Sequence, residues 1–195
     1  MQVLILGHNG MLGHMVKKYF ELKNIKVFTI NYKFPSEQFK NEIIKFTGDF
    51  IINCIGAIPQ KTKVFDINFN LPLFLNDNVN CKIIHPGTDC EIDNDDYGMS
   101  KKKASDYIKL NSKNTKILKV SIIGPELNSK SSLMEWFLNS EGEVFGYKNA
   151  YWNGITTLEW AKQCLSLMEN WNDYDIETII EGTRISKYEL LKLIV

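Results

Sequence analysis

The chain has 195 residues, which one domain, or one domain with a small lobe, accounts for. Hydrophobic residues make up 44% of it and charged residues 24%, which is ordinary for a soluble globular protein. Basic and acidic residues balance at 23 each, which argues against a dedicated nucleic-acid binder or polybasic membrane binder. No apolar run approaches the roughly 18 residues of a membrane span, and the start lacks the charged region of a signal peptide.

The chain contains four cysteines, which lie far apart: Cys54, Cys81, Cys90 and Cys164. None of them belongs to a CxxC pair or stands near a pair of histidines, so the sequence predicts no metal site. Free thiols of this kind are typical of a reducing compartment, and we therefore expect a cytoplasmic protein.

Short apolar or β-branched runs alternate with longer helical patterns over the first two-thirds of the chain. The predicted strands cover residues 3–6, 26–30, 50–54, 82–85 and 116–121. The predicted helices between them cover residues 11–23, 36–46, 64–76 and 97–111. Single helices between strands indicate right-handed βαβ units, and strands that are apolar throughout indicate burial on both faces. The sequence therefore predicts an α/β fold, a doubly wound parallel sheet with helices on both faces.

The pattern changes after Gly124 and Pro125. Helical patterns follow at 131–139 and 157–170, then a short strand near 177–180 and a last helix from Ser186 that runs to the end of the sequence. These elements suggest a small α+β lobe. We therefore expect a sheet domain at residues 1–125 and a small C-terminal lobe at residues 126–195.

A glycine-rich turn follows the first predicted strand and opens the first predicted helix. It reads GHNGMLG (residues 7–13), one position off the GxGxxG spacing of dinucleotide-binding proteins. Glycines there allow a tight turn and let a pyrophosphate approach the backbone, while the helix N-terminus supplies free N–H groups. The turn favours a Rossmann-type cofactor site, although a turn without a ligand could have the same spacing. Its candidate cofactor-binding residues are Gly7, Asn9, Gly10, Met11, Leu12 and Gly13.

The end of the second predicted strand bears on which nicotinamide cofactor would bind. An acidic residue at that point would hold the ribose 2′-hydroxyl of NAD, but the sequence there carries Asn31 and Lys33 instead. An amide and a cation suit a 2′-phosphate better, so NADP(H) is preferred and NAD(H) remains an alternative. Lys33 as a solvated surface lysine is the competing interpretation.

A second motif, Tyr97-Gly98-Met99-Ser100-Lys101, lies at the start of a predicted helix. Positions i and i+4 share one helix face, and a nearby ammonium would lower the pKa of the Tyr97 phenol from its usual ~10. Tyr97 is then a candidate general acid for a carbonyl oxygen that receives hydride. Thr88, just beyond the fourth predicted strand, is placed to hold that oxygen with its hydroxyl.

In their order along the chain, these motifs resemble the extended short-chain dehydrogenase/reductases, and among them the dTDP-4-dehydrorhamnose reductase family of nucleotide-sugar 4-ketoreductases. The resemblance implies an NAD(P)H-dependent oxidoreductase that reduces a nucleotide-linked 4-keto-6-deoxy sugar in deoxysugar and polysaccharide biosynthesis. The segments that carry it are GHNGMLG (7–13), INCIGAI (52–58), the region of Asn68, HPGTDC (85–90), YGMSK (97–101), SIIGPEL (121–127), SLMEWFL (132–138) and WNGITTLEWA (152–161).

The resemblance also implies roles for individual residues. Thr88 would be the catalytic hydroxyl, Tyr97 the proton donor, and Lys101 the residue that tunes Tyr97 and holds the nicotinamide ribose. Further cofactor contacts are implied after the third and fifth strands, at Cys54, Ile55, Gly56, Ala57, Ile122 and Ile123. The substrate pocket in the lobe would use Thr88, Asp89, Trp152, Asn153 and Thr156.

Two departures from the family pattern keep other functions open. Thr88 and Tyr97 are joined by a short acidic link, read here as a solvated loop, where relatives carry a longer insert, and the substrate lobe is short. A non-catalytic NADP-binding regulatory module is therefore the main alternative. An epimerase or dehydratase ranks third, because Cys90 stands where a dehydratase-like acid would follow Asp89. An edge left exposed by the short lobe would also allow a homodimer.

Overall fold

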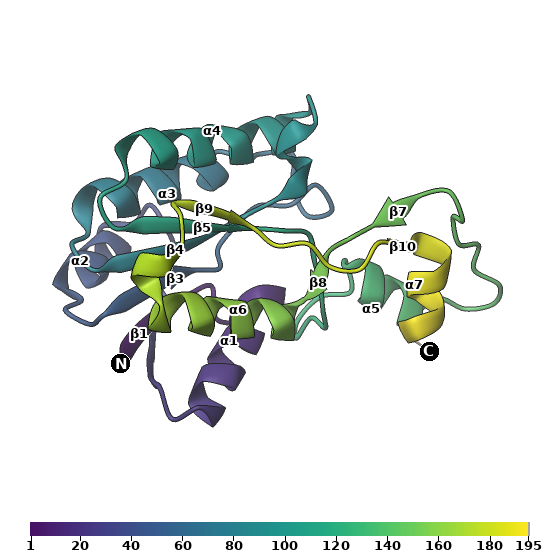
Figure 1. Ribbon diagram of the computed structural model, residues 1–195, viewed down its shortest axis with the longest axis horizontal. Coiled ribbons are helices and arrows are strands. Elements are labelled where there is room, and N and C mark those ends of the chain that lie inside the picture. Colours follow the sequence, from purple (N-terminus) through teal and green to yellow (C-terminus); the bar gives the residue numbers. More distant parts are fainter. Residues whose placement is uncertain (195) are drawn as a thin grey trace.

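A computed structural model describes residues 1–194 of the chain, which fold around one six-stranded sheet (Figure 1). Every neighbouring pair in this sheet is parallel, which confirms the predicted doubly wound parallel sheet of a Rossmann-type fold. In spatial order the strands are β2 (Lys26–Thr29), β1 (Gln2–Leu6), β3 (Phe50–Asn53), β4 (Lys82–Gly87), β5 (Thr115–Lys119) and β9 (Glu177–Ile179).

Helices cover both faces of the sheet, as Figure 1 shows. One face carries α1 (Met11–Leu22) and α6 (Thr157–Glu169), which pack against each other. The other carries α2 (Glu37–Lys45), α3 (Ile67–Asn78) and α4 (Asp96–Asn111), of which α3 and α4 form a pair.

Alternate strand residues supply the two apolar cores. Val3 and Ile5 point to the α1/α6 side, whereas Leu4 and Leu6 point to the α2/α3 side. This two-sided burial explains why residues 3–6 of β1 form an uninterrupted apolar run.

A small lobe projects beyond the carboxyl ends of the sheet strands (Figure 1). It contains the antiparallel pair β7 (Tyr151–Trp152) and β10 (Ile185–Ser186) and the helices α5 (Leu133–Leu138) and α7 (Lys187–Ile194). The two-residue strands β6 (Ile122–Ile123) and β8 (Ile155–Thr156) pair where the chain leaves the sheet. Two short 3-10 helices complete the structure, η1 (Asp89–Ile92) and η2 (Trp171–Asp173). Val195, where we expect the last helix to end, lies outside the described residues.

The boundary predicted at residue 125 does not divide the chain in this way. The chain returns to the sheet after β6, because α6 packs on α1 and β9 pairs with β5 as the sixth strand. Trp160 and Leu167 of α6 are fully buried in the core that also contains Val3. The lobe is therefore smaller than predicted. It consists of a segment before α6 and the end of the chain after β9.

Among residues 1–194, no helix is both long enough and apolar enough to cross a membrane.

Candidate active site

The glycine turn forms as predicted between β1 and α1. Gly7 has a positive φ of +75°, and a side chain there would also collide with the backbone of Cys54 at the end of β3. Gly13, on the first turn of α1, lies so close to Gly7 that a methyl group would overlap the Gly7 carbonyl. The turn is thus held flat against both strands, at the point between β1 and β3 where the order of the parallel sheet reverses.

The N-terminus of α1 is suited to an anion. Its N-cap is Gly10, no side chain of the described residues caps it, and no acidic residue lies in its first turn. The free N–H groups and the helix dipole at this end are therefore not neutralised by an acidic residue in the first turn of α1 itself. Asn9, Gly10 and Met11 line a cavity of about 440 Å³ at this helix end.

The opposite wall of this cavity carries an ion pair that the sequence reasoning missed. Lys61 Nζ lies 2.8 Å from Glu126 Oε1, and both residues line the cavity together with Ser129 and Ser131. Burial opposes the charge of Glu126, but hydrogen bonds from Lys61, Ser129 and two backbone N–H groups outweigh it and hold its pKa at about 2. Lys61 and Glu126 are 65 residues apart, so no local sequence signal predicts their contact.

Thr88, Tyr97 and Lys101 come together at the carboxyl end of β4. Thr88 follows β4 directly, Tyr97 lies in the first turn of α4, and Lys101 lies one turn further along. The Thr88 hydroxyl lies near Tyr97 and lowers the pKa of the phenol, while it donates its own hydrogen bond to Asp89 Oδ1 at 3.2 Å. Lys101 is buried, and its ammonium donates to the carbonyl oxygen of Pro86 at 2.8 Å. The structure therefore groups the three residues that the sequence singled out.

The pKa of Tyr97 is raised to about 12, so the prediction that Lys101 lowers it is wrong for this structure. Burial is the largest cause, and only the hydrogen bond from Thr88 acts in the other direction. Acidic neighbours disfavour the phenolate further: Cys90, Asp89 and Glu91. A phenol that stays neutral at physiological pH is a proton donor, which suits protonation of an alkoxide better than proton abstraction.

Burial lowers the pKa of Lys101 to about 8, although Glu91 favours its charged form. Its neighbour His85 is also buried, and burial and the Lys101 charge lower the pKa of His85 well below its usual value. His85 Nδ1 lies 3.2 Å from the side-chain nitrogen of Asn53 on β3, whereas its Nε2 has no hydrogen-bond partner among residues 1–194. Lys101 is therefore a buried cation, and keeping it charged in the folded protein lowers the free energy of unfolding.

Lys101→Met is expected to raise the free energy of unfolding at pH 7 by up to about 3 kcal/mol, because it removes this buried charge. The pKa of Lys101 is about 8 in the folded protein and about 10.5 in the unfolded chain. Between these two pH values the unfolded chain binds more protons than the folded protein, so the stability of the wild-type protein rises with pH there. The difference in free energy of unfolding between Lys101→Met and the wild-type protein should therefore shrink as the pH rises from 8 to about 10.5. Urea unfolding at pH 7 and at pH 10.5 measures it. Lys102→Met, at an exposed position on the same helix, is the control, and an equal effect there would contradict the account.

Asn68 connects the segment after β3 to the start of α4 through its side-chain amide. Its side chain accepts from the Ala57 N–H at 2.7 Å and donates to the Ala57 carbonyl at 3.0 Å and to Ser100 Oγ at 3.2 Å. Ser100 in turn donates to the Tyr97 carbonyl at 2.7 Å. The predicted cofactor residue Ala57 and the first turn of α4 are thus fixed to each other.

The other predicted cofactor residues occupy varied positions. Cys54, Ile55 and Gly56 follow β3 beside the glycine turn, as expected. Asn31 and Lys33 are exposed beyond the end of the edge strand β2. Ile122 and Ile123 are half-buried in β6, which pairs with β8 rather than with the sheet.

The predicted substrate residues are only partly grouped around Thr88. Ser121 Oγ donates to Asp89 Oδ1 at 2.6 Å, and the Ser121 carbonyl accepts from the Ile155 N–H at 3.0 Å, which links Asp89 to β8. Thr156 in β8 uses its hydroxyl to cap α6, where it accepts from Glu159 N–H at 3.1 Å. In residues 1–194, no hydrogen bond joins Trp152 or Asn153 to Thr88 or Tyr97.

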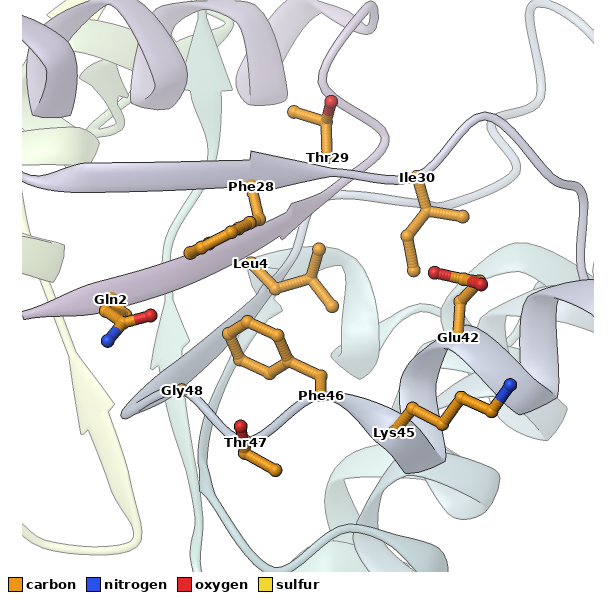
Figure 2. Close-up of a pocket in the computed structure, with 10 residues that line it drawn as sticks. All are labelled: Gln2, Leu4, Phe28, Thr29, Ile30, Glu42, Lys45, Phe46, Thr47 and Gly48. Carbon is orange, nitrogen blue, oxygen red and sulfur yellow. The ribbon is translucent and has the colours of Figure 1, made fainter.

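A second cavity, of about 250 Å³, lies under the β2 edge of the sheet (Figure 2). Leu4, Phe28 and Phe46 form its apolar part, and Glu42 and Lys45 of α2 line its rim. It contains none of the predicted site residues. No group of three or more His, Cys, Asp or Glu side chains suited to a metal ion occurs among the described residues.

The sheet order, the glycine turn and the position of Thr88 and Tyr97 define a Rossmann-type α/β fold with a candidate site at its carboxyl edge. No protein-family model matches the chain, and no curated protein matches its sequence.

Solved structures share this fold. A dTDP-4-dehydrorhamnose reductase from Clostridium acetobutylicum superposes with a TM-score of 0.80 at 18% identity, over 100% of this chain and 79% of its own. The dTDP-4-dehydrorhamnose reductase of Bacillus anthracis in complex with NADP gives 0.78 at 17% identity, over 99% and 79%. A UDP-glucose 4-epimerase from Thermotoga maritima with UDP-glucose also gives 0.78, at 15% identity over 100% and 81%.

Proposed function

We propose that the protein is an NAD(P)H-dependent reductase of a nucleotide-linked 4-keto-6-deoxy sugar. The observation that carries this proposal is the pairing of the Thr88 hydroxyl with a neutral, buried Tyr97 phenol beside Lys101. That group lies at the same edge of the sheet as the glycine turn. The similarity in fold to two dTDP-4-dehydrorhamnose reductases supports the choice of reaction.

The residues around the α1 N-terminus fit the diphosphate of a dinucleotide. Gly7 and Gly13 lack the β-carbons that would collide with Cys54 and with the Gly7 carbonyl, so the turn can pack closely against β3 and α1. The first-turn N–H groups of α1 would supply donors to the phosphates. The cofactor, when bound, supplies the hydride.

Tyr97 and Thr88 would handle the oxygen of the reacting carbonyl. The Thr88 hydroxyl orients and polarises that oxygen by a hydrogen bond, and the phenol of Tyr97 protonates it as negative charge develops. The pKa of about 12 keeps the phenol protonated in readiness for this step. Lys101, whose ammonium donates to the Pro86 carbonyl of β4, would hold the nicotinamide ribose of the cofactor.

The exposed amide and cation beyond β2 favour NADPH over NADH, through contacts of Asn31 and Lys33 with a 2′-phosphate. Lys33→Ala is therefore expected to weaken NADPH binding by about fivefold, in line with a solvent-exposed charge-assisted contact, and to leave NADH binding unchanged. Fluorescence titration with both cofactors measures this. Lys40→Ala, on α2, is the control. Equal changes in the Kd of NADPH and of NADH would show that Lys33 does not contact the 2′-phosphate.

The experiment that tests the function is oxidation of NADPH in the presence of dTDP- and UDP-linked 4-keto-6-deoxy sugars. Stoichiometric loss of NADPH with one of them supports the reductase. Binding of NADPH without oxidation across the whole panel would favour the regulatory module instead. Conversion of a nucleotide sugar with no net loss of NADPH would favour the third candidate, an epimerase or dehydratase.

A further inference from the structure

Glu91 is a buried carboxylate in the link that joins β4 to α4. Its side chain is 3% exposed, whereas the residues from Ile92 to Asp96 are exposed. The interpretation of the whole acidic link as a solvated loop is therefore wrong at this position. A buried charge is tolerated only where ion pairing and hydrogen bonds compensate for its loss of water.

Both carboxylate oxygens of Glu91 contact groups at or near Thr88. Oε1 accepts from the Thr88 N–H at 3.2 Å and from Ser105 Oγ at 2.9 Å, and Oε2 lies 2.8 Å from Lys119 Nζ. In return, the Thr88 hydroxyl accepts from the Cys90 N–H at 3.3 Å, so Thr88 and Glu91 form a capping box around η1. The Thr88 backbone is thus bonded to a side chain that is itself fixed on two sides.

The partners of Glu91 are anchored in rigid elements. Lys119 is the last residue of β5, and Ser105 lies on the buried side of α4. Lys119 Nζ also lies 3.8 Å from Glu177 of β9, which continues the ion pairs to the edge of the sheet. Thr88 is therefore held by the sheet and the catalytic helix, although it lies at the start of a nine-residue connection to Tyr97.

We propose that Glu91 is a positioning residue that holds Thr88 in place beside Tyr97, and thereby next to the substrate oxygen. This inference rests on the proposed reductase function. Glu91 acts through its bond to the Thr88 N–H, with Lys119 and Ser105 fixing its own orientation. A short connection of exposed residues could not fix the threonine by itself, and displacement of a catalytic group by about 1 Å costs roughly 100-fold in rate.

The test compares Glu91→Met, which removes both acceptors, with Glu91→Gln, which keeps one oxygen for the Thr88 N–H. Glu91→Met should lower kcat roughly 10- to 100-fold with KM for the sugar and the Kd of NADPH unchanged, and Glu91→Gln should recover most of that loss. Glu177→Met, which removes the outer partner of Lys119, is the matched control and should stay within about twofold of wild type.

A double-mutant cycle separates positioning from general damage. In a Thr88→Val background, Glu91→Met should add less than about a twofold further loss, because the hydroxyl it positions is already absent. A full further loss in that background, an equal loss in Glu177→Met, or a rise in KM instead of a fall in kcat would overturn the proposal.

Amide hydrogen exchange gives a readout that needs no turnover. The Thr88 amide of the wild-type protein should exchange slowly compared with those of the exposed residues 92–95, and this protection should be lost in Glu91→Met but kept in Glu177→Met. If the wild-type protein reduces no sugar, the proposed function is wrong. The hydrogen-exchange experiment then still tests whether Glu91 fixes the position of Thr88. A Thr88 amide that exchanges freely in the wild-type protein would overturn the inference even if Glu91→Met does not fold.

Discussion

Tyr97→Phe is expected to lower kcat by about 1,000-fold, while the Kd of NADPH changes less than about threefold. The substitution removes the one phenolic proton next to Thr88 and keeps the aromatic ring, which packs edge-on against Phe65 with ring centres 5.7 Å apart. Packing of the α4 N-terminus is therefore retained, and only the proton donor is lost. Single-turnover oxidation of bound NADPH measures the effect without interference from product release.

Tyr107→Phe is the matched control for this result. Tyr107 lies on the same helix and donates to Asp77 at 2.9 Å, but it is on the α3 side and away from Thr88. Its replacement removes a phenol of the same chemistry and should leave kcat within about twofold of wild type. A Tyr97→Phe protein with near-normal kcat would remove Tyr97 from the reaction.

Gly13→Ala is expected to weaken NADPH binding by at least about 100-fold, since it displaces the turn that presents two or more N–H donors to the phosphates. The added methyl group would overlap the Gly7 carbonyl, so the turn must move away from α1. Alanine is the better helix former by about 1 kcal/mol, so loss of helix propensity cannot account for the effect. Fluorescence titration with NADPH provides the measurement.

Gly10→Ala serves as the graded comparison for this variant. A β-carbon at Gly10 would meet the Gly7 carbonyl oxygen at 3.3 Å, a contact that a small shift relieves. Its Kd should therefore rise by less than about threefold. Equal weakening in the two variants, or normal binding in Gly13→Ala, would show that the closeness of Gly13 to Gly7 does not matter for the cofactor.

Local sequence patterns predicted most of the sheet. The first five strands are confirmed within a few residues, because each is an apolar run bounded by polar residues and separated from the next by one helix. The sixth strand, β9, has only three residues and was assigned to the lobe. β9 lies beside β5 because the chain returns to the sheet through α6. Nothing in the sequence of β9 itself indicates this return.

The sequence predicted where the candidate residues lie in the fold better than it predicted their electrostatics. Spacing alone brought Tyr97 and Lys101 to one helix face, but it could not show that burial would raise the pKa of the first or that Pro86 would receive the ammonium of the second. Glu91 had one local signal, because Thr88-Asp89-Cys90-Glu91 fits a capping box. Its burial depends on Lys119, 28 residues away, which only the folded chain brings close.

Transfer of label from NADPH tests the central claim most directly. The protein would be incubated with NADPH carrying deuterium at C4 of the nicotinamide, in each stereochemical form, and with a nucleotide-linked 4-keto-6-deoxy sugar. We expect one of the two forms to deliver a single deuterium to C4 of the sugar, which mass spectrometry of the product detects, and Tyr97→Phe to slow the transfer by about 1,000-fold. A protein that binds NADPH and leaves every sugar unlabelled would contradict it.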